Sequence, residues 1–75
     1  MVLYIEYTEN ADIGRDALYK EWATAKIEFL FRKEAFLSLR NEKAVKLWTI
    51  DKDHFAWKHA DDSDNTIYHV QLIQL

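Results

Sequence analysis

The chain has 75 residues, 49% of them hydrophobic and 15% aromatic, with no cysteine, no proline and a formal net charge of −3. This composition argues against a disordered chain, a disulfide framework and a thiolate metal site. The mild charge argues against a general nucleic-acid coat, and no apolar run approaches the ~20 residues that span a bilayer. We therefore expect a single domain over residues 1–75, located in the cytoplasm and without contact to a membrane.

The first residues alternate in polarity. Leu3, Ile5 and Tyr7 fall on one side of an extended chain, whereas Tyr4 and Glu6 fall on the other. Such alternation is typical of a β-strand, because successive side chains point to opposite faces. The sequence predicts a strand over residues 2–7.

The next segment has helical spacing. Asn10 and Asp12 are candidate N-cap residues, and Leu18 and Trp22 then share one stripe of a helix. Gly14, the only glycine in the chain, falls near the start of this helix, where a flexible residue costs least. The sequence predicts a helix over residues 12–24.

Composition and periodicity disagree over residues 26–40. The segment is rich in Leu, Ala, Glu, Lys and Arg, which favour helices. Because burial usually determines a pattern more strongly than intrinsic propensity, we interpret the alternation of this segment as strand. One long helix over residues 12–41 is the alternative. The odd positions, of which six of seven are apolar, are Ile27, Phe29, Phe31, Lys33, Ala35, Leu37 and Leu39.

The alternation continues to the end of the chain, with turn-like breaks between the segments. The sequence predicts an α+β fold: an N-terminal strand, one α-helix and an antiparallel β-meander of four to five strands, with the helix packed on one face. In the last strand, Tyr68, Val70 and Leu72 form the more apolar set. The strands of the meander are predicted over residues 26–32, 35–40, 44–50, 54–60 and 66–74. The predicted core comprises Ile27, Phe29, Phe31, Leu37, Leu39, Val45, Leu47, Phe55 and Trp57.

The even positions of these strands would form the opposite face of the sheet. Basic residues alternate there with apolar and aromatic ones: Lys26, Leu30, Arg32, Phe36, Arg40, Lys46, Trp48, Ile50, His54 and Lys58. The pattern suits an acidic protein partner, with Trp48 and Arg40 as anchors, and it also fits a solvated sheet face. The residues predicted to bind are Phe36, Arg40, Lys46, Trp48, His54 and Lys58.

The predicted function is a non-enzymatic protein-binding module, namely a small inhibitor or modulator of a larger protein of the kind that mobile genetic elements encode. The alternative is a single-stranded nucleic-acid-binding protein, in which Arg40, Lys46 and Lys58 follow phosphates while Trp48 stacks on a base. The apolar residues of the same face also predict a homodimer. Nucleic acid is the less favoured of these partners.

Neither catalysis nor metal binding is expected. The chain has no cysteine nucleophile, and no serine is spaced for a histidine–acid pair. The acidic run over residues 61–65 lacks the central glycine and twelfth-position glutamate of a calcium loop, so it predicts a turn. His54 and His59 would point to opposite faces of one strand, and His59 and His69 could be cross-strand neighbours. We expect structural histidines, no catalytic residue, no metal site and no cofactor.

Overall fold

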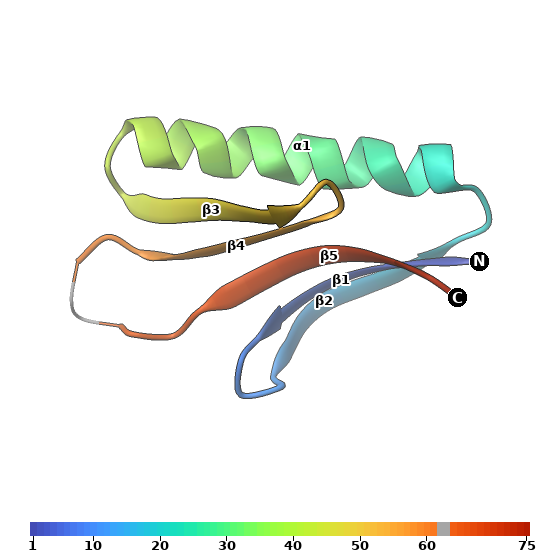
Figure 1. The fold of residues 1–75 in the computed structure, drawn as a ribbon, viewed down its shortest axis with the longest axis horizontal. Helices are drawn as coiled ribbons and strands as arrows, with labels where there is room; N and C mark the ends of the chain where they lie inside the picture. Colours follow the sequence, from blue (N-terminus) through green and yellow to red (C-terminus); the bar gives the residue numbers. More distant parts are fainter. Residues whose placement is uncertain (62–63) are drawn as a thin grey trace.

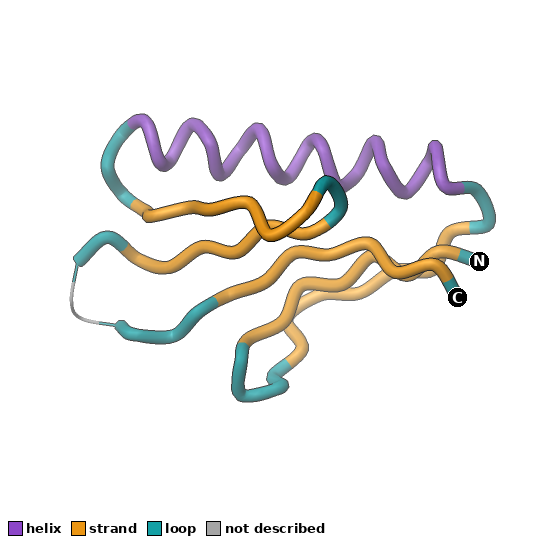
Figure 2. The backbone as a smooth tube through the Cα atoms, viewed as in Figure 1, coloured by secondary structure: helices purple, strands orange, loops and turns teal. Residues whose placement is uncertain are grey.

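The computed structural model describes residues 1–61 and 64–75; Asp62 and Ser63 of the predicted acidic turn lie outside the described residues. The helix lies on one side of an antiparallel sheet (Figures 1 and 2). The predicted α+β class, with a helix packed against the sheet, is confirmed. Over the described residues the elements are β1 (Val2–Thr8), β2 (Ile13–Tyr19), α1 (Trp22–Asn41), β3 (Val45–Asp51), β4 (His54–His59) and β5 (Tyr68–Gln74).

The sheet has the order β2-β1-β5-β4-β3, and every neighbouring pair is antiparallel. The pairing of β1 with β5 joins the N-terminal hairpin to the C-terminal meander. It also brings the two ends of the chain together, since the N–H of Leu75 donates to the carbonyl of Met1 at 2.9 Å (Figure 1). Strands β2 and β3 form the two edges.

The predicted helix over residues 12–24 is wrong, because residues 13–19 form strand β2. A turn at residues 8–12 reverses the chain: the N–H of Thr8 donates to the carbonyl of Asp12, and the N–H of Ala11 donates to that of Thr8, both at 2.9 Å. An isolated helix of this length is marginal, whereas the extended segment pairs with β1 along its length. Tertiary pairing therefore outweighs the local helical spacing.

The predicted strands over residues 26–32 and 35–40 are also wrong, because this segment is part of α1. Neither glycine nor proline interrupts it, and most of its residues favour a helix. Ala25, Phe29 and Phe36 form its buried stripe, at intervals of four and seven residues, which is the spacing of one helical face. A helix of this length extends ~30 Å and runs along the sheet (Figure 1).

The period-2 pattern arises because α1 has apolar residues on two of its faces. Phe29 is fully buried, but Ile27 and Phe31, two positions away on either side, are each 70% exposed. At 100° per residue, positions two apart lie about 200° apart on the helix, so they cannot share a face. The odd positions therefore do not share one buried face, and the predicted burial of Ile27 and Phe31 is wrong.

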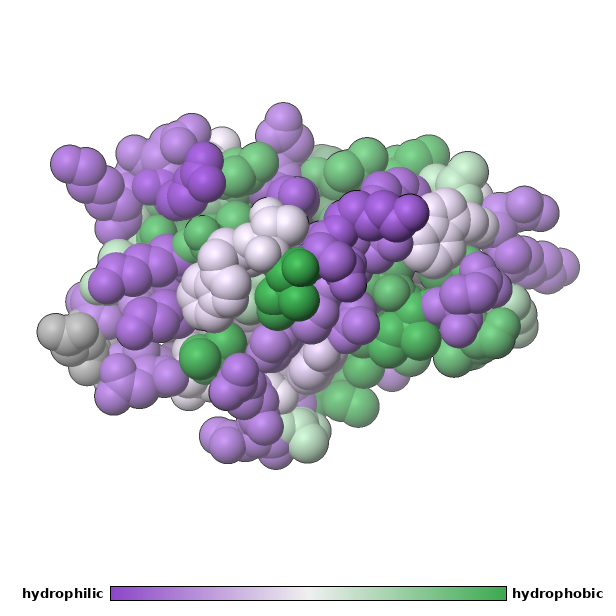
Figure 3. Space-filling view, viewed as in Figure 1, coloured by the Kyte–Doolittle hydropathy of each residue, from purple (hydrophilic) through white to green (hydrophobic). Residues whose placement is uncertain are grey.

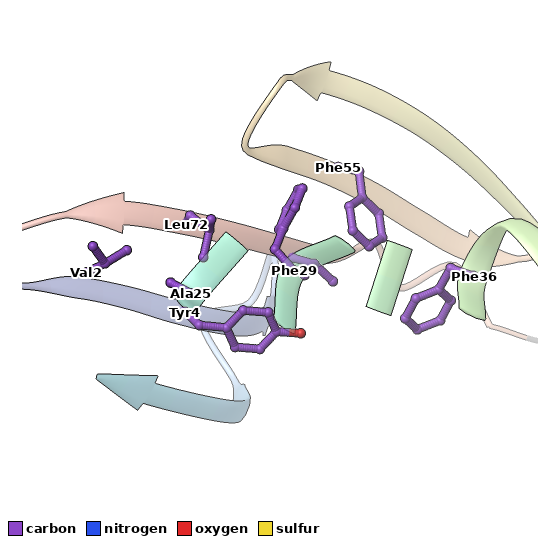
Figure 4. Close-up of a cluster of buried hydrophobic side chains, with 8 residues drawn as sticks. Val2, Tyr4, Ala25, Phe29, Phe36, Phe55 and Leu72 are labelled. Carbon is purple, nitrogen blue, oxygen red and sulfur yellow. The ribbon is translucent and has the colours of Figure 1, made fainter. Parts of the chain in front are cut away.

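The core lies between α1 and the inner face of the sheet. Figure 4 shows side chains from the helix and from the strands pointing toward one another. The ring of Phe55 packs against Phe29 at 5.5 Å and against Phe36 at 6.0 Å between centroids. The core cluster consists of Val2, Tyr4, Ala25, Phe29, Phe36, Phe55, Val70 and Leu72.

The predicted core is confirmed for the C-terminal strands. Val45 and Phe55 are buried, and Leu47 and Trp57 pack against the core cluster. In β5, Val70 and Leu72 are buried and Tyr68 lies on the same face, so the more apolar set of this strand points to the helix. On α1, however, Leu39 is exposed and Leu37 is only half-buried.

Among the described residues, three ion pairs attach α1 to the strands and their loops. Arg32 donates to Glu6 of β1 through Nε and Nη2 at 2.8 and 3.0 Å, and the hydroxyl of Tyr4 donates to the same carboxylate. The predicted place of Arg32 on the opposite sheet face is therefore wrong. The predicted place of Lys26 on that face is wrong for the same reason, because Lys26 and Arg32 both extend from α1 toward the strands and their loops. The other two pairs are Arg15–Glu28 and Lys26–Asp53, each at 2.6 Å.

The Glu6 network predicts a loss of stability in acid. Burial opposes ionisation of Glu6, but hydrogen bonds from Arg32 and Tyr4 outweigh it and hold its pKa below the ordinary value of 4.5. The contribution of this carboxylate is therefore complete above pH 4.5 and is lost as the pH falls through its folded pKa. Urea unfolding at a series of pH values should show this decline in stability, and Glu6→Gln should make the decline smaller.

The Glu6→Gln substitution should lower the free energy of unfolding by about 1.5–3 kcal/mol near neutral pH, because a charge-assisted hydrogen bond is lost. An unchanged pH profile in Glu6→Gln would contradict the assignment.

The helix ends in a Schellman motif in which Lys43 occupies the left-handed position that glycine usually takes. The N–H of Lys43 donates to the carbonyl of Arg40, and the N–H of Ala44 donates to that of Leu39, both at 2.9 Å. Lys43 has a φ of 62°, in the left-handed region that favours glycine. A side chain at this position is therefore strained.

Replacing Lys43 by glycine should stabilise the protein by about 0.5–1 kcal/mol, because relief of a left-handed cost of ~1–2 kcal/mol exceeds the added chain entropy. Thermal unfolding followed by circular dichroism should show a midpoint higher by several degrees. Lys43→Ala is the matched control, since it removes the same charge but keeps a β-carbon. If the alanine variant is as stable as the glycine variant, backbone strain is not the cause.

Candidate functional site

The side of the sheet opposite α1, which we call the open face, is covered by no helix in residues 1–61 and 64–75 (Figure 2). Directly paired residues of antiparallel strands point to the same side, so the register assigns its members. They are Ile13, Asp16 and Leu18 from β2, Leu3, Ile5 and Tyr7 from β1, His69, Gln71 and Ile73 from β5, His54, Ala56 and Lys58 from β4, and Lys46, Trp48 and Asp51 from β3.

The β2 side of the open face is mostly apolar, with Asp16 between Ile13 and Leu18 on the same strand. This apolar corner consists of Leu3, Ile5, Ile13, Leu18 and Ile73. Ile13 is 60% exposed and Leu18 is 58% exposed, both on the edge strand β2. Ile5, Ile13 and Ile73 also line, with Tyr7, Ala11 and Gln71, a hollow of about 300 Å³. The corner thus combines protruding aliphatic side chains with a recess beside them.

The opposite end carries a basic corner, made of Lys46, Trp48 and Lys58. Lys46 pairs directly with Lys58 across β3 and β4, and Trp48 pairs with Ala56. Because alanine is small, the Trp48 ring has no bulky side chain opposite it, and 39% of the residue is exposed. Two cations therefore lie beside one accessible aromatic ring.

Between the two corners lies a hydrogen-bonded group of aromatic residues. Nε2 of His54 lies 2.8 Å from Nδ1 of His69, and Nε2 of His69 lies 3.2 Å from Oε1 of Glu9. The ring of Tyr7 stacks on His69 at 5.0 Å with an interplanar angle of 10°, and its hydroxyl donates to Gln71 at 2.7 Å. Burial, and then the neighbouring His69, lower the pKa of His54. The group links β1, β5 and β4 across the middle of the face.

Of the residues predicted to bind, Lys46, Trp48, His54 and Lys58 lie together on the open face, as the strand pattern predicted. Phe36 does not, because it is 7% exposed and stacks on Trp57 in the core at 4.6 Å. Its predicted place on the opposite sheet face is therefore wrong. Arg40 lies in the last turn of α1, so its predicted place on that face is wrong as well. Both errors follow from the strand interpretation of residues 26–40.

The apolar corner was missed by sequence reasoning. The helical spacing of residues 12–24 predicts a helix for Ile13 and Leu18, which leaves them out of any predicted sheet face. One signal was present: Leu3, Ile5 and Ile73 are apolar although the other side of their strands, with Tyr4 and Leu72, is apolar too. A strand that is apolar on both sides predicts a sheet that is covered on both faces.

The outer surface of α1 is a second apolar region, the helix stripe, formed by Ile27, Leu30 and Phe31. Leu30 is 49% exposed, and the other two are more exposed still. In Figure 3, hydrophobic surface appears along the edge of the molecule where α1 runs. The three residues lie within four positions, so they share the side of the helix away from the core. The molecule therefore has apolar surface on both of its outer faces.

The possible pairing of His59 with His69 does not occur. His69 lies beside His54 instead of His59, and Nε2 of His59 lies 3.9 Å from Oδ2 of Asp64. Among the residues that the structure describes, no group of three or more His, Asp and Glu side chains is arranged to hold a metal ion.

Comparison of the chain with protein-family models, with curated proteins and with solved structures found no match. In the described part of the chain, no helix is both long enough and apolar enough to cross a membrane.

Proposed function

We propose that this protein is a non-enzymatic protein-binding module that docks its open face on a larger protein and so inhibits or modulates it. The observation that carries the proposal is the apolar corner, where Ile13 and Leu18 are exposed along β2 and Ile13 lines a hollow of about 300 Å³. Exposed apolar side chains that gather on one face of a domain commonly mark an interaction site. Burial of one such side chain contributes about 1.5–3 kcal/mol, so a partner that covers the corner gains several such contributions.

The basic corner specifies the chemistry of the partner. Lys46 and Lys58 favour an acidic surface, while Trp48 offers the type of aromatic anchor that is enriched at binding hot spots. We therefore propose a partner with an apolar patch bordered by acidic side chains. A second copy of this chain is a less favourable occupant, because a face-to-face dimer must keep each basic corner away from its counterpart.

Several features favour a protein over single-stranded nucleic acid. Arg40, one of three cations in the nucleic-acid hypothesis, lies on α1, away from Lys46 and Lys58. Branched aliphatic side chains, not stacking platforms, make up the apolar corner. The remaining two lysines give a short track for phosphates.

The proposal is tested by affinity capture from the native host with nuclease treatment, using three baits: wild type, Leu18→Glu and Ile27→Glu. Each substitution puts one carboxylate on an exposed aliphatic position, Leu18 on the open face and Ile27 on the helix stripe. Wild type and Ile27→Glu should retain the same protein, and Leu18→Glu should bind it at least about tenfold more weakly.

Other outcomes would overturn the proposal. Loss of the partner with Ile27→Glu alone would move the docking site to the helix stripe. Release by nuclease would favour nucleic acid, and a concentration-dependent mass of the purified chain, abolished by Leu18→Glu, would identify a second copy as the occupant. Circular dichroism of each bait confirms that the fold is retained.

A further inference from the structure

The imidazole rings of His54 and His69 lie in direct contact on the open face, although the two residues are not directly paired across the strands. They are diagonal neighbours, since His54 pairs with Gln71 while His69 pairs with Ala56. Their facing nitrogens, Nε2 of His54 and Nδ1 of His69, are nevertheless only 2.8 Å apart. One ring nitrogen of each histidine is therefore directed at the other, on the open face.

We infer that His54 and His69 form a two-histidine clamp for a divalent transition-metal ion of the zinc type. Imidazole nitrogen suits Zn²⁺, Ni²⁺ and Cu²⁺, and does not suit Mg²⁺ or Ca²⁺. Two nitrogens at ~2.1 Å from a tetrahedral zinc ion lie ~3.4 Å apart. The two nitrogens must therefore separate by about 0.6 Å, and each ring must turn so that its lone pair points at the ion instead of at the other ring. Water fills the remaining coordination positions.

The surroundings of His69 hold its ring in the orientation that the clamp requires. Nε2 of His69 lies 3.2 Å from the carboxylate of Glu9, so this nitrogen carries the proton and Nδ1 keeps its lone pair. A carboxylate on the far nitrogen of a metal-ligating histidine is a recurrent device that orients the ring and raises its basicity. The stacked ring of Tyr7 restrains the same imidazole from one side.

His54 can supply the second lone pair without releasing a proton. Its Nε2–H now donates to Nδ1 of His69, and a change of tautomer moves that proton to Nδ1 of His54. Burial and the neighbouring His69 already favour the neutral ring, which is the form that binds metal. The inference concerns the isolated chain and does not depend on the proposed function.

The test is titration of the purified chain with Zn²⁺ near neutral pH, followed by calorimetry and by NMR of the histidine rings. One ion per chain should bind and shift the signals of His54 and His69, while those of His59 stay in place. His54→Gln should weaken binding about tenfold or more, Glu9→Gln should weaken it to a smaller degree, and His59→Gln should leave it unchanged. Mg²⁺ at the same concentration should produce no shift.

Two results would overturn the inference. One is Zn²⁺ affinity that is equal in wild type and His54→Gln, which would place the ion elsewhere on the chain. The other is an absence of shifts at His54 and His69 up to millimolar Zn²⁺, which would mean that the pair shares a proton only. Because His54 lies on the open face, His54→Gln should keep the fold, and His69→Asn provides a second variant if it does not.

Discussion

Replacing Phe29 by alanine should destabilise the protein by about 3–5 kcal/mol, the largest loss that we expect from one substitution. Phe29 is fully buried between α1 and the sheet, where its ring packs edge-on against Phe55. A domain of this size has a total stability of about 4–11 kcal/mol, so the variant should unfold at a much lower urea concentration.

The matched control is Phe31→Ala. Phe31 has the same side chain, lies two positions away on the same helix and is 70% exposed, so its removal should change the stability by about 0.5 kcal/mol or less. In a strand the two residues would share a face and the two substitutions would have similar costs. Urea unfolding of both variants measures the difference. If Phe29→Ala does not fold at all, Phe29→Leu should give a smaller loss that still exceeds that of Phe31→Ala.

Replacing Trp48 by alanine should reduce affinity for the protein partner by about 2 kcal/mol, or roughly 30-fold, because an aromatic anchor in the basic corner is lost. Its effect on stability should be about 1 kcal/mol or less, since Trp48 lies on the open face of an edge strand. Lys46→Glu should mainly slow association and increase its dependence on salt. Surface plasmon resonance with the captured partner separates the two effects.

Trp57→Ala is the contrasting variant. Trp57 stacks on Phe36 at 4.6 Å and on Tyr68 at 4.3 Å, on the same side of the sheet as the helix. Its loss should cost about 3 kcal/mol of stability or more, with little direct effect on binding by the molecules that remain folded. If Trp48→Ala unfolds the protein while Trp57→Ala is tolerated, the two faces of the sheet have been assigned the wrong way round.

The C-terminal half of the fold could be predicted because its alternation and its burial agree. In β3 and β4, Val45, Leu47, Phe55 and Trp57 point to the helix side, and Lys46, Trp48, Ala56 and Lys58 point away. These strands are covered on one face, so polarity reports burial directly. Four of the six residues predicted to bind belong to this half, and they lie together on the open face.

The strand predicted over residues 2–7 is confirmed by β1, but residues 12–41 could not be predicted in the same way, because exposed apolar residues there imitate a buried set. Ile27 and Phe31 gave residues 26–40 the period of a strand, although they lie on the solvent side of α1. Ile13 and Leu18 are likewise apolar and exposed. The exposed apolar residues behind the wrong predictions thus include Ile13 and Leu18 of the proposed docking surface, and Ile27, the control position in its test.

The sequence by itself determined the α+β class and the facing of β3 and β4, because side-chain period and burial agree there. It also contained the helical preference of residues 22–41 in its composition. Only the tertiary structure decided that residues 13–19 pair with β1 and that Phe36 enters the core while Ile27 does not. Those outcomes depend on contacts between segments distant in sequence. A local pattern records which residues are apolar, but not which of them another element covers.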